Sequence, residues 1–222
     1  MSKGIFITAT GTDIGKTYVT ALLIRKMRRI GLNTGYYKAA LSGAECIAES
    51  DAGYVNKFAN IDQDENTLVS YLYKNAVSPH LAAQIEGNPP ELSKIKSDYD
   101  NVCKKYNYVI VEGSGGIVCP IRWDDSSHLL LEDIIKALDL GAIIVADAGL
   151  GTINSVVLTA EYMRNHDIAV HGIILNNFTG TQMQNDNAFM IEELIGISIV
   201  GKVGKNADEI DISEDLLKNL FK

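Results

Sequence analysis

The sequence has no apolar run long enough to cross a bilayer, and its start has no charged segment followed by an apolar one. We therefore expect no membrane partner and a cytoplasmic location. Internal repeats and low-complexity linkers are also missing. With 222 residues and 46% hydrophobic content, residues 1–222 are expected to form a single domain with a substantial core.

Basic residues are outnumbered and cysteines are few. Twenty Lys and Arg stand against 28 Asp and Glu, which gives a net charge of −8. This balance argues against broad nucleic-acid binding, which needs positive surface to neutralise phosphates. The three cysteines, Cys46, Cys103 and Cys119, are odd in number and lack metal-ligand spacing. We expect them to be buried free thiols in a reducing compartment.

A phosphate-binding loop is indicated within residues 4–20, GIFITATGTDIGKTYVT. A short apolar run typical of a buried parallel strand comes first, and apolar residues at helical spacing come last. Between them lies a loop of small residues that ends in Gly15-Lys16-Thr17. Loop N–H groups and the positive helix end would surround a polyphosphate. Lys16 would reach the terminal phosphates, and the Thr17 hydroxyl would hold Mg²⁺.

This loop departs from the strict pattern, because Thr10 stands where the pattern has Gly. The alternative is an ordinary Gly-containing turn with a surface lysine. The correct order of strand, loop, Lys-Thr and helix favours the phosphate loop.

Charged residues follow two further predicted strands. Lys38 lies near the end of a strand predicted over residues 33–40, with Ser42 just beyond it. Lys38 is predicted at a strand end in the same layer as the phosphate loop. This position supports contact with a ligand as well as it supports the alternative, a solvated lysine on the surface. Glu112 ends an apolar strand over residues 108–112, where a carboxylate supports Mg²⁺ beside a phosphate loop; the alternative is an acid at a tight turn.

Other candidates have two interpretations each. Asp51 begins a predicted helix and either caps it or faces a metal. His80, in Ser78-Pro-His, is a helix-start residue or a substrate contact. Residues 149–155 lead into a helix whose free N–H groups suit a substrate carboxylate, unless the helix is ordinarily capped. Asn176 and Asn177 follow a strand over residues 170–175. Their side-chain amides would either form hydrogen bonds with the edge of an adenine base or stabilise a turn.

The succession of elements predicts an α/β fold of the P-loop NTPase kind, a mostly parallel sheet with helices on both faces. The phosphate loop, Lys38, Glu112, Gly151 and Asn176 all follow strands, so they are expected along one edge of the sheet. Helices are further predicted over residues 91–105, 129–138 and 213–221, and strands over residues 142–147 and 196–203.

Taken together, these stretches resemble the dethiobiotin synthetase family from Lys3 to about Asp208. The matching segments are Thr12-Asp-Ile-Gly-Lys-Thr17, Gly35-Tyr-Tyr-Lys38 with Ser42-Gly43, Ser50-Asp51, Ser78-Pro-His80, Glu112-Gly-Ser-Gly-Gly116, Leu150-Gly-Thr-Ile-Asn154 and Asn176-Asn177. The lysine followed by Ser-Gly, the Ser-Pro-His and the Leu-Gly-x-Ile-Asn are together the specific part of the match.

The resemblance implies a homodimeric enzyme whose site is completed by the partner subunit. Its substrates would be 7,8-diaminononanoate, CO₂ and ATP, and its products dethiobiotin, ADP and phosphate. The diamine captures CO₂ as a carbamate, the carbamate attacks the γ-phosphate to give a carbamic–phosphoric anhydride, and the second amine closes the cyclic urea. Mg²⁺ would be required with ATP.

The resemblance and the pattern together assign roles to residues. Catalytic roles fall on Lys38, Lys16 and Thr12. Nucleotide-binding roles fall on Asp13, Ile14, Gly15, Lys16, Thr17, Tyr18, Asp51, Glu112, Gly113, Ser114, Gly115, Asn176, Asn177 and Gly204. Substrate-binding roles fall on Ser42, Gly151, Thr152 and Asn154, and metal-binding roles on Thr17, Asp51 and Glu112. Gly204 replaces a proline usual in the family, and Phe189 stands where some members use Tyr.

Two other functions fit a P-loop fold. A dimeric partition-type ATPase switch usually has a second lysine early in the loop, where this chain has Gly11. A non-catalytic regulatory P-loop domain tends to lose parts of the loop, whereas Gly-Lys-Thr is intact here. Both are therefore less favoured than the synthetase.

Overall fold

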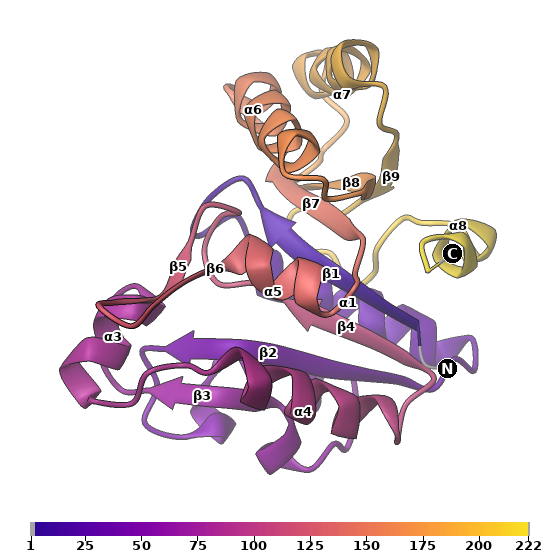
Figure 1. Cartoon of the computed structure of the whole chain (residues 1–222). Coiled ribbons are helices and arrows are strands. Elements are labelled where there is room, and N and C mark those ends of the chain that lie inside the picture. The colour runs from indigo at the N-terminus through magenta and orange to yellow at the C-terminus, as the bar shows by residue number, and fades with distance from the viewer. Residues whose placement is uncertain (1–2, 222) are drawn as a thin grey trace.

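Seven parallel strands form the centre of the molecule (Figure 1). The computed structural model describes residues 3–221, so residues 1, 2 and 222 of the predicted domain lie outside the described part. Across the sheet the strands are β3 (Val69–Tyr73), β2 (Thr34–Ser42), β4 (Tyr108–Glu112), β1 (Lys3–Ala9), β7 (Ala142–Asp147), β8 (Val170–Asn176) and β9 (Ile199–Lys202). Neighbouring strands pair in parallel throughout, which confirms the predicted fold class.

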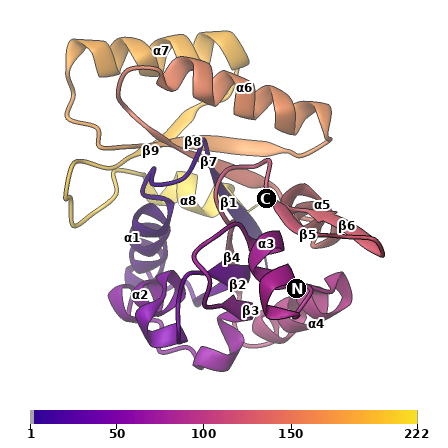
Figure 2. The ribbon, with the colours of Figure 1, turned by 90° about the vertical axis from the view of Figure 1, so that its left-hand side faces the viewer.

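Helices cover both faces of this sheet, as Figure 2 shows with α1 and α2 on one side and α3 to α5 on the other. One face carries α1 (Lys16–Arg29), α2 (Asp51–Phe58) and α8 (Glu214–Asn219). The other carries α3 (Pro79–Glu86), α4 (Leu92–Cys103), α5 (Leu131–Ala137), α6 (Thr152–Asn165) and α7 (Gln182–Ile195). The remaining elements are a small hairpin and two short 3₁₀ turns, η1 (Ile47–Glu49) and η2 (Glu65–Thr67).

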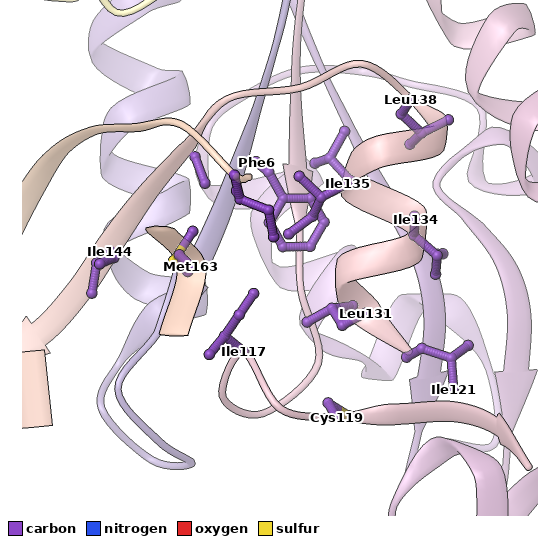
Figure 3. Packing of buried hydrophobic residues seen from close by; sticks show 14 of the residues in the cluster. Phe6, Ile117, Cys119, Ile121, Leu131, Ile134, Ile135, Leu138, Ile144 and Met163 are labelled. Atoms are coloured by element: carbon purple, nitrogen blue, oxygen red, sulfur yellow. The ribbon is translucent and has the colours of Figure 1, made fainter. Parts of the chain in front are cut away.

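The strand sequences are continuously apolar because both faces of the sheet are buried. In β1, Ile5 and Ile7 point to the α1 side, while Phe6 points to the α5 side. Figure 3 shows Phe6 among the buried side chains of α5, including Leu131 and Ile135. Strands buried on both faces lose the polar alternation of a half-exposed strand. The carboxyl ends of these strands therefore define one edge, where connecting loops carry the polar residues.

Several predicted boundaries need correction. The helix expected over residues 129–138 begins only at Leu131, because residues 127–130 form β6 (Ser127–Leu130), which pairs antiparallel with β5 (Pro120–Asp124). The strand expected over residues 196–203 is β9 alone, because α7 runs to Ile195 and ends at Gly196 in the left-handed region (φ 67°). No element was predicted for β3, the hairpin or α7.

The structure shows how far each of the three cysteines is buried. The three cysteines are free, but only Cys119 is buried; Cys103 is half-buried, and Cys46 is exposed, so the expectation of three buried thiols is wrong. Within residues 3–221, none of the helices combines the length and the apolar character needed to cross a bilayer.

Candidate active site

The phosphate loop lies between β1 and α1, as predicted, and is fixed in place by β8. Asp13 and Gly15 have left-handed backbones, with φ of 60° and 84°. A side chain at Gly15 would lie 2.3 Å from the Asn176 Nδ2 atom, so glycine is required there. Asn176 donates that amide to the Ile14 carbonyl oxygen at 2.8 Å. No side chain of the described residues caps α1, so its first N–H groups remain available to an anion.

A pocket of about 290 Å³ opens at this loop. Thirteen residues line it: Gly11, Thr12, Asp13, Ile14, Gly15, Lys16, Thr17, Lys38, Leu41, Ser42, Asp51, Ser114 and Gly115. They come from the phosphate loop, β2, the start of α2 and the loop after β4. Residues predicted from four separate stretches of sequence therefore meet at one sheet edge. Glu112 adjoins them through its contacts with Lys38 and Thr17 but is itself only 1% exposed.

A cluster of two ammonium groups and two carboxylates lies at this pocket, and three of its members, Lys16, Lys38 and Asp51, line it. Lys38 Nζ lies 2.9 Å from Asp51 Oδ2 and 2.9 Å from Glu112 Oε1. Lys16 Nζ is 3.9 Å from the same Glu112 oxygen, and Thr17 donates its hydroxyl to it at 2.9 Å. The register of the sheet explains the central pair, because Lys38 lies directly opposite Glu112 on β2 and β4.

Lys38 differs from its predicted position. It was placed near the end of a strand ending at residue 40, but β2 continues to Ser42, so Lys38 lies inside the strand. Its side chain is 4% exposed, which excludes the alternative of a solvated surface lysine. The cap alternative for Asp51 is also excluded, because Ser50 is the N-cap of α2 and accepts from the Gly53 N–H. Asp51 is the first helical residue and pairs with Lys38 instead.

Burial and charge set the protonation of the cluster. Burial lowers the pKa of Lys16, against the attraction of Glu112. Burial also disfavours the charged form of Lys38, but Glu112 and Asp51 outweigh it and raise the pKa of Lys38. Burial disfavours ionised Asp51, and the Lys38 ammonium outweighs it and lowers the pKa of Asp51. At neutral pH, Lys38 is therefore a fixed cation rather than a base.

The atoms of the cluster provide ligands suited to Mg²⁺. Glu112 Oε2 is buried, and within residues 3–221 it has no hydrogen-bond partner. The described residues contain no group of three or more His, Cys, Asp or Glu side chains arranged to hold a metal. A magnesium site here would need Thr17, one or two carboxylates, water and phosphate oxygens, which is the donor set Mg²⁺ prefers. The residues fit the ion.

The residues predicted for the adenine side do not line the pocket. Asn177 donates its side-chain amide to Asp147 Oδ2 at 2.6 Å and has a left-handed backbone, φ 56°. Tyr18 donates its hydroxyl to the Ala207 carbonyl oxygen, and Gly204 packs near the same residue. These residues therefore form one group beside β8 and β9, and Asn176 connects it to the loop.

The residues predicted for the substrate carboxylate lie elsewhere. Gly151, Thr152 and Asn154 begin α6 after β7, and none of them lines the pocket. Gly151 has φ of 89°, and no side chain of the described residues caps this helix. Thr152 Oγ1 is buried and unpartnered within the described chain. Leu150, directly before them, is 91% exposed.

The structure places further predicted residues and adds others. Ser114 donates its hydroxyl to the Ala40 carbonyl oxygen at 2.7 Å. Gly113 packs against Phe6, where a side chain would lie 2.8 Å from the ring. Leu41 lines the pocket and was not predicted. An apolar residue within a strand gives no sequence signal of its own, so only the fold reveals it.

Comparison with known proteins gives consistent results. A family model described as an AAA domain matches residues 3–211. The ATP-dependent dethiobiotin synthetase BioD of Brachyspira hyodysenteriae is 55% identical over 222 residues, covering 100% of both chains. The enzyme of the same name from Clostridium botulinum strain Langeland is 47% identical over 226 residues, covering 100% of this chain and 99% of that one.

Among solved structures, the fold is shared with proteins of low sequence identity. A ParA family ATPase from Chlorobium tepidum matches with a TM-score of 0.58 and 14% identity, over 100% of this chain and 89% of that one. The MinD cell division protein of Aquifex aeolicus matches with a TM-score of 0.57 and 13% identity, over 99% of this chain and 87% of that one. At this identity the likeness concerns the fold alone.

Proposed function

The chain belongs to the ATP-dependent dethiobiotin synthetases and to the AAA domain family, and from this premise we propose that its pocket joins a diamine, CO₂ and ATP. The product is the cyclic urea dethiobiotin, and ATP is converted to ADP and phosphate. The observation that carries the proposal is that Lys16 and Lys38, which both line the phosphate-loop pocket, share the carboxylate of Glu112 beside it.

The chemistry requires such a cluster because two anions must meet. A carbamate and a triphosphate repel each other, and fixed positive groups lower the energy of their approach. Lys16 extends from the phosphate loop, and Lys38 faces it from β2 across Glu112. Because these side chains are 11% and 4% exposed, they act in a region poor in water, where charges act more strongly.

We assign the first step, carbamate formation, to the side of the pocket lined by Thr12, Lys38 and Ser42. One substrate amine bonds to CO₂ and loses a proton, which gives the carbamate. Lys38 holds the developing charge, and the Thr12 hydroxyl is available as a donor. Ser42 donates to the Val77 carbonyl oxygen at 2.6 Å and would have to turn its hydroxyl toward the carbamate.

In the second step, a carbamate oxygen bonds to the γ-phosphorus while the bond to the ADP oxygen breaks. The chain contributes the loop N–H groups and Lys16, which hold the phosphates in line. In the third step, the second amine bonds to the carbamate carbon and loses its proton, and phosphate leaves with the oxygen it gained. Lys38 is placed to stabilise charge in each step.

We propose that Thr17, Asp51 and Glu112 hold Mg²⁺ directly or through water. When bound, the ion would neutralise charge on the β- and γ-phosphate oxygens. The support is that the Thr17 hydroxyl and the carboxylates of Asp51 and Glu112 meet beside the phosphate loop, with Thr17 Oγ1 2.9 Å from Glu112 Oε1. Lys38 lies between the two carboxylates, as the cation they hold in this structure.

We also propose a homodimer in which the start of α6 reaches the partner's pocket and binds the far carboxylate of the diamine. The uncapped N–H groups at Gly151–Asn154 suit a carboxylate, yet these residues do not line their own chain's pocket. Large apolar side chains are exposed before α6, on α6 and on α7: Leu150 at 91%, Leu158 at 62% and Phe189 at 58%. A second copy of the chain would cover them.

Three smaller assignments complete the proposal. Residues 1–222 act as one synthetase domain, because the sheet takes strands from both halves of the chain. The adenine base lies beside Asn176, Asn177 and Gly204, the group that adjoins the phosphate loop. The cytoplasm is the proposed location, because it supplies ATP.

The test is ADP release by purified protein with Mg²⁺ and bicarbonate, with and without the diamine, together with detection of the cyclic urea. The proposal predicts ADP release that depends on the diamine and matches the urea formed. ATP hydrolysis at the same rate without the diamine, and no urea, would contradict it.

A further inference from the structure

Seven side-chain polar atoms are buried without a hydrogen-bond partner in the described chain, and two of them, the Tyr36 hydroxyl and Glu112 Oε2, belong to the neighbouring strands β2 and β4. Tyr36 is fully buried, and Glu112 is 1% exposed. Buried polar atoms in proteins are almost always paired, so two orphans in one region require a reason. The reaction described above does not use Tyr36.

These two groups are neighbours in the sheet. In the pairing of β2 with β4, Tyr36 lies opposite Ile110 and Lys38 lies opposite Glu112. Alternate residues of a strand share a face, so Tyr36 lies diagonally beside Glu112 on the α1 side. At neutral pH a tyrosine hydroxyl is protonated, so Tyr36 can donate a hydrogen bond to a carboxylate beside it.

The hydrogen bonds that Glu112 accepts from the described residues all go to its other carboxylate oxygen, Oε1. Oε1 accepts from Lys38 and Thr17, both at 2.9 Å, and Lys16 lies 3.9 Å away. During turnover both lysines are assigned to the phosphates and the carbamate. Oε1 then loses its ammonium neighbours, and of the contacts in the described residues the Thr17 hydrogen bond still holds it.

We propose that Tyr36 is a positioning residue, whose hydroxyl donates to Glu112 Oε2 when Lys16 and Lys38 engage the substrates. Tyr36 touches neither nucleotide nor diamine, and it acts by holding the Glu112 carboxylate in the orientation that nucleotide binding needs. This inference rests on the proposed function for the part played by the two lysines. It explains why a tyrosine, rather than an apolar residue of similar size, occupies this buried position.

The first test is Tyr36→Phe, which removes only the hydroxyl. The neighbouring Tyr37→Phe is the matched control, because Tyr37 is equally buried but faces the other core. Its hydroxyl bonds with Ser70 Oγ at 2.6 Å and donates to the Ile95 carbonyl oxygen at 3.0 Å. We expect Tyr37→Phe to lower the melting temperature of the free protein, and Tyr36→Phe to leave it unchanged or raise it.

The functional readouts then separate positioning from packing. For Tyr36→Phe, we expect the Mg²⁺ concentration at half-maximal rate to rise roughly tenfold and kcat to fall by a similar factor, as for loss of one hydrogen bond to a charged group. The KM for the diamine should not change. Tyr37→Phe should keep the wild-type Mg²⁺ dependence.

Binding of ADP with Mg²⁺, measured by calorimetry, gives a readout that needs no turnover. Tyr36→Phe should weaken this binding in the wild-type background and have no further effect in a Glu112→Gln background, because the hydroxyl acts through Glu112. An unchanged Mg²⁺ dependence and unchanged binding in Tyr36→Phe would overturn the inference. So would an equal effect in both backgrounds. If wild-type protein shows no diamine-dependent turnover, the proposed function fails, and the calorimetric comparison still decides the role of Tyr36.

Discussion

Replacing Lys38 with Met tests how the free energy of unfolding depends on burial within one ion-pair cluster. Lys38 Nζ lies 2.9 Å from each of two carboxylates, so distance does not distinguish them. Burial does, because the Glu112 side chain is 0% exposed and the Asp51 side chain is 52% exposed. Methionine keeps the length and the apolar stem of lysine and removes the charge.

The magnitudes follow from these exposures. Removing one partner of a buried ion pair costs about 3–5 kcal/mol, because the other charge stays buried and uncompensated. Glu112 keeps the Thr17 hydroxyl and has Lys16 at 3.9 Å, so we expect the lower end, about 3 kcal/mol, for Lys38→Met. The half-exposed Asp51 contributes about 1 kcal/mol or less of this, because water replaces the lost partner.

The assay is urea denaturation of a double-mutant cycle. We expect Lys38→Met and Glu112→Gln to couple by about 2 kcal/mol or more, and Lys38→Met and Asp51→Asn by less than about 1 kcal/mol. Equal slopes of unfolding free energy against urea are needed for the comparison. Equal coupling of Lys38 to both carboxylates would refute the reasoning, because burial would then not decide the strength of the pairs.

Three further perturbations test other parts of the account. Lys38→Gln should lower kcat by roughly 100-fold or more while changing nucleotide affinity much less, measured by turnover and calorimetry; equal losses would make Lys38 a nucleotide anchor. Leu150→Asp, at the 91% exposed position, should dissociate the dimer in sedimentation experiments and reduce turnover, and a fully active monomer would contradict the shared site. Burial raises the pKa of the Cys119 thiol to about 11, against the opposing effect of Lys16 and Lys38. At pH 8, about one Cys119 thiol in a thousand is then ionised, so iodoacetamide should modify the exposed Cys46 and spare Cys119. Cys119 labelling should increase as the pH rises toward 11; comparable labelling of both at pH 8 would be inconsistent with its burial.

The phosphate loop and the buried strands could be predicted because their signals are local. The apolar residues 142–147 match β7 at both ends, and the loop ends where α1 begins at Lys16. Glu112 was identified correctly as the last residue of β4. In each case, one stretch of sequence contains both the pattern and its boundary.

The remaining elements depend on contacts distant in sequence. β3 is an edge strand with three of its five residues only half-buried, and its apolar pattern is correspondingly weak. Leu129 and Leu130 continue the apolar pattern of α5, and only the pairing of residues 127–130 with β5 makes them a strand. The first six residues of α7, Gln-Met-Gln-Asn-Asp-Asn, are polar except for Met183, and Asn and Asp are weak helix formers. The Thr181 side chain caps the helix and sets its start.

The candidate site shows the same division. Sequence reasoning identified Lys16, Thr17, Lys38, Asp51 and Glu112, all of which the structure brings together. Their pairing was not predictable, because it depends on the register of β2 against β4 and on the start of α2. Whether these residues perform the proposed roles remains a prediction.

The central claim is that the carbamate oxygen attacks the outermost phosphate within this pocket. It is tested most directly by supplying CO₂ labelled with ¹⁸O, in an incubation short enough to limit exchange with water, and analysing the released phosphate by mass spectrometry. The account predicts that each phosphate released with the cyclic urea contains an oxygen from CO₂. Phosphate that contains oxygen from water instead would contradict it.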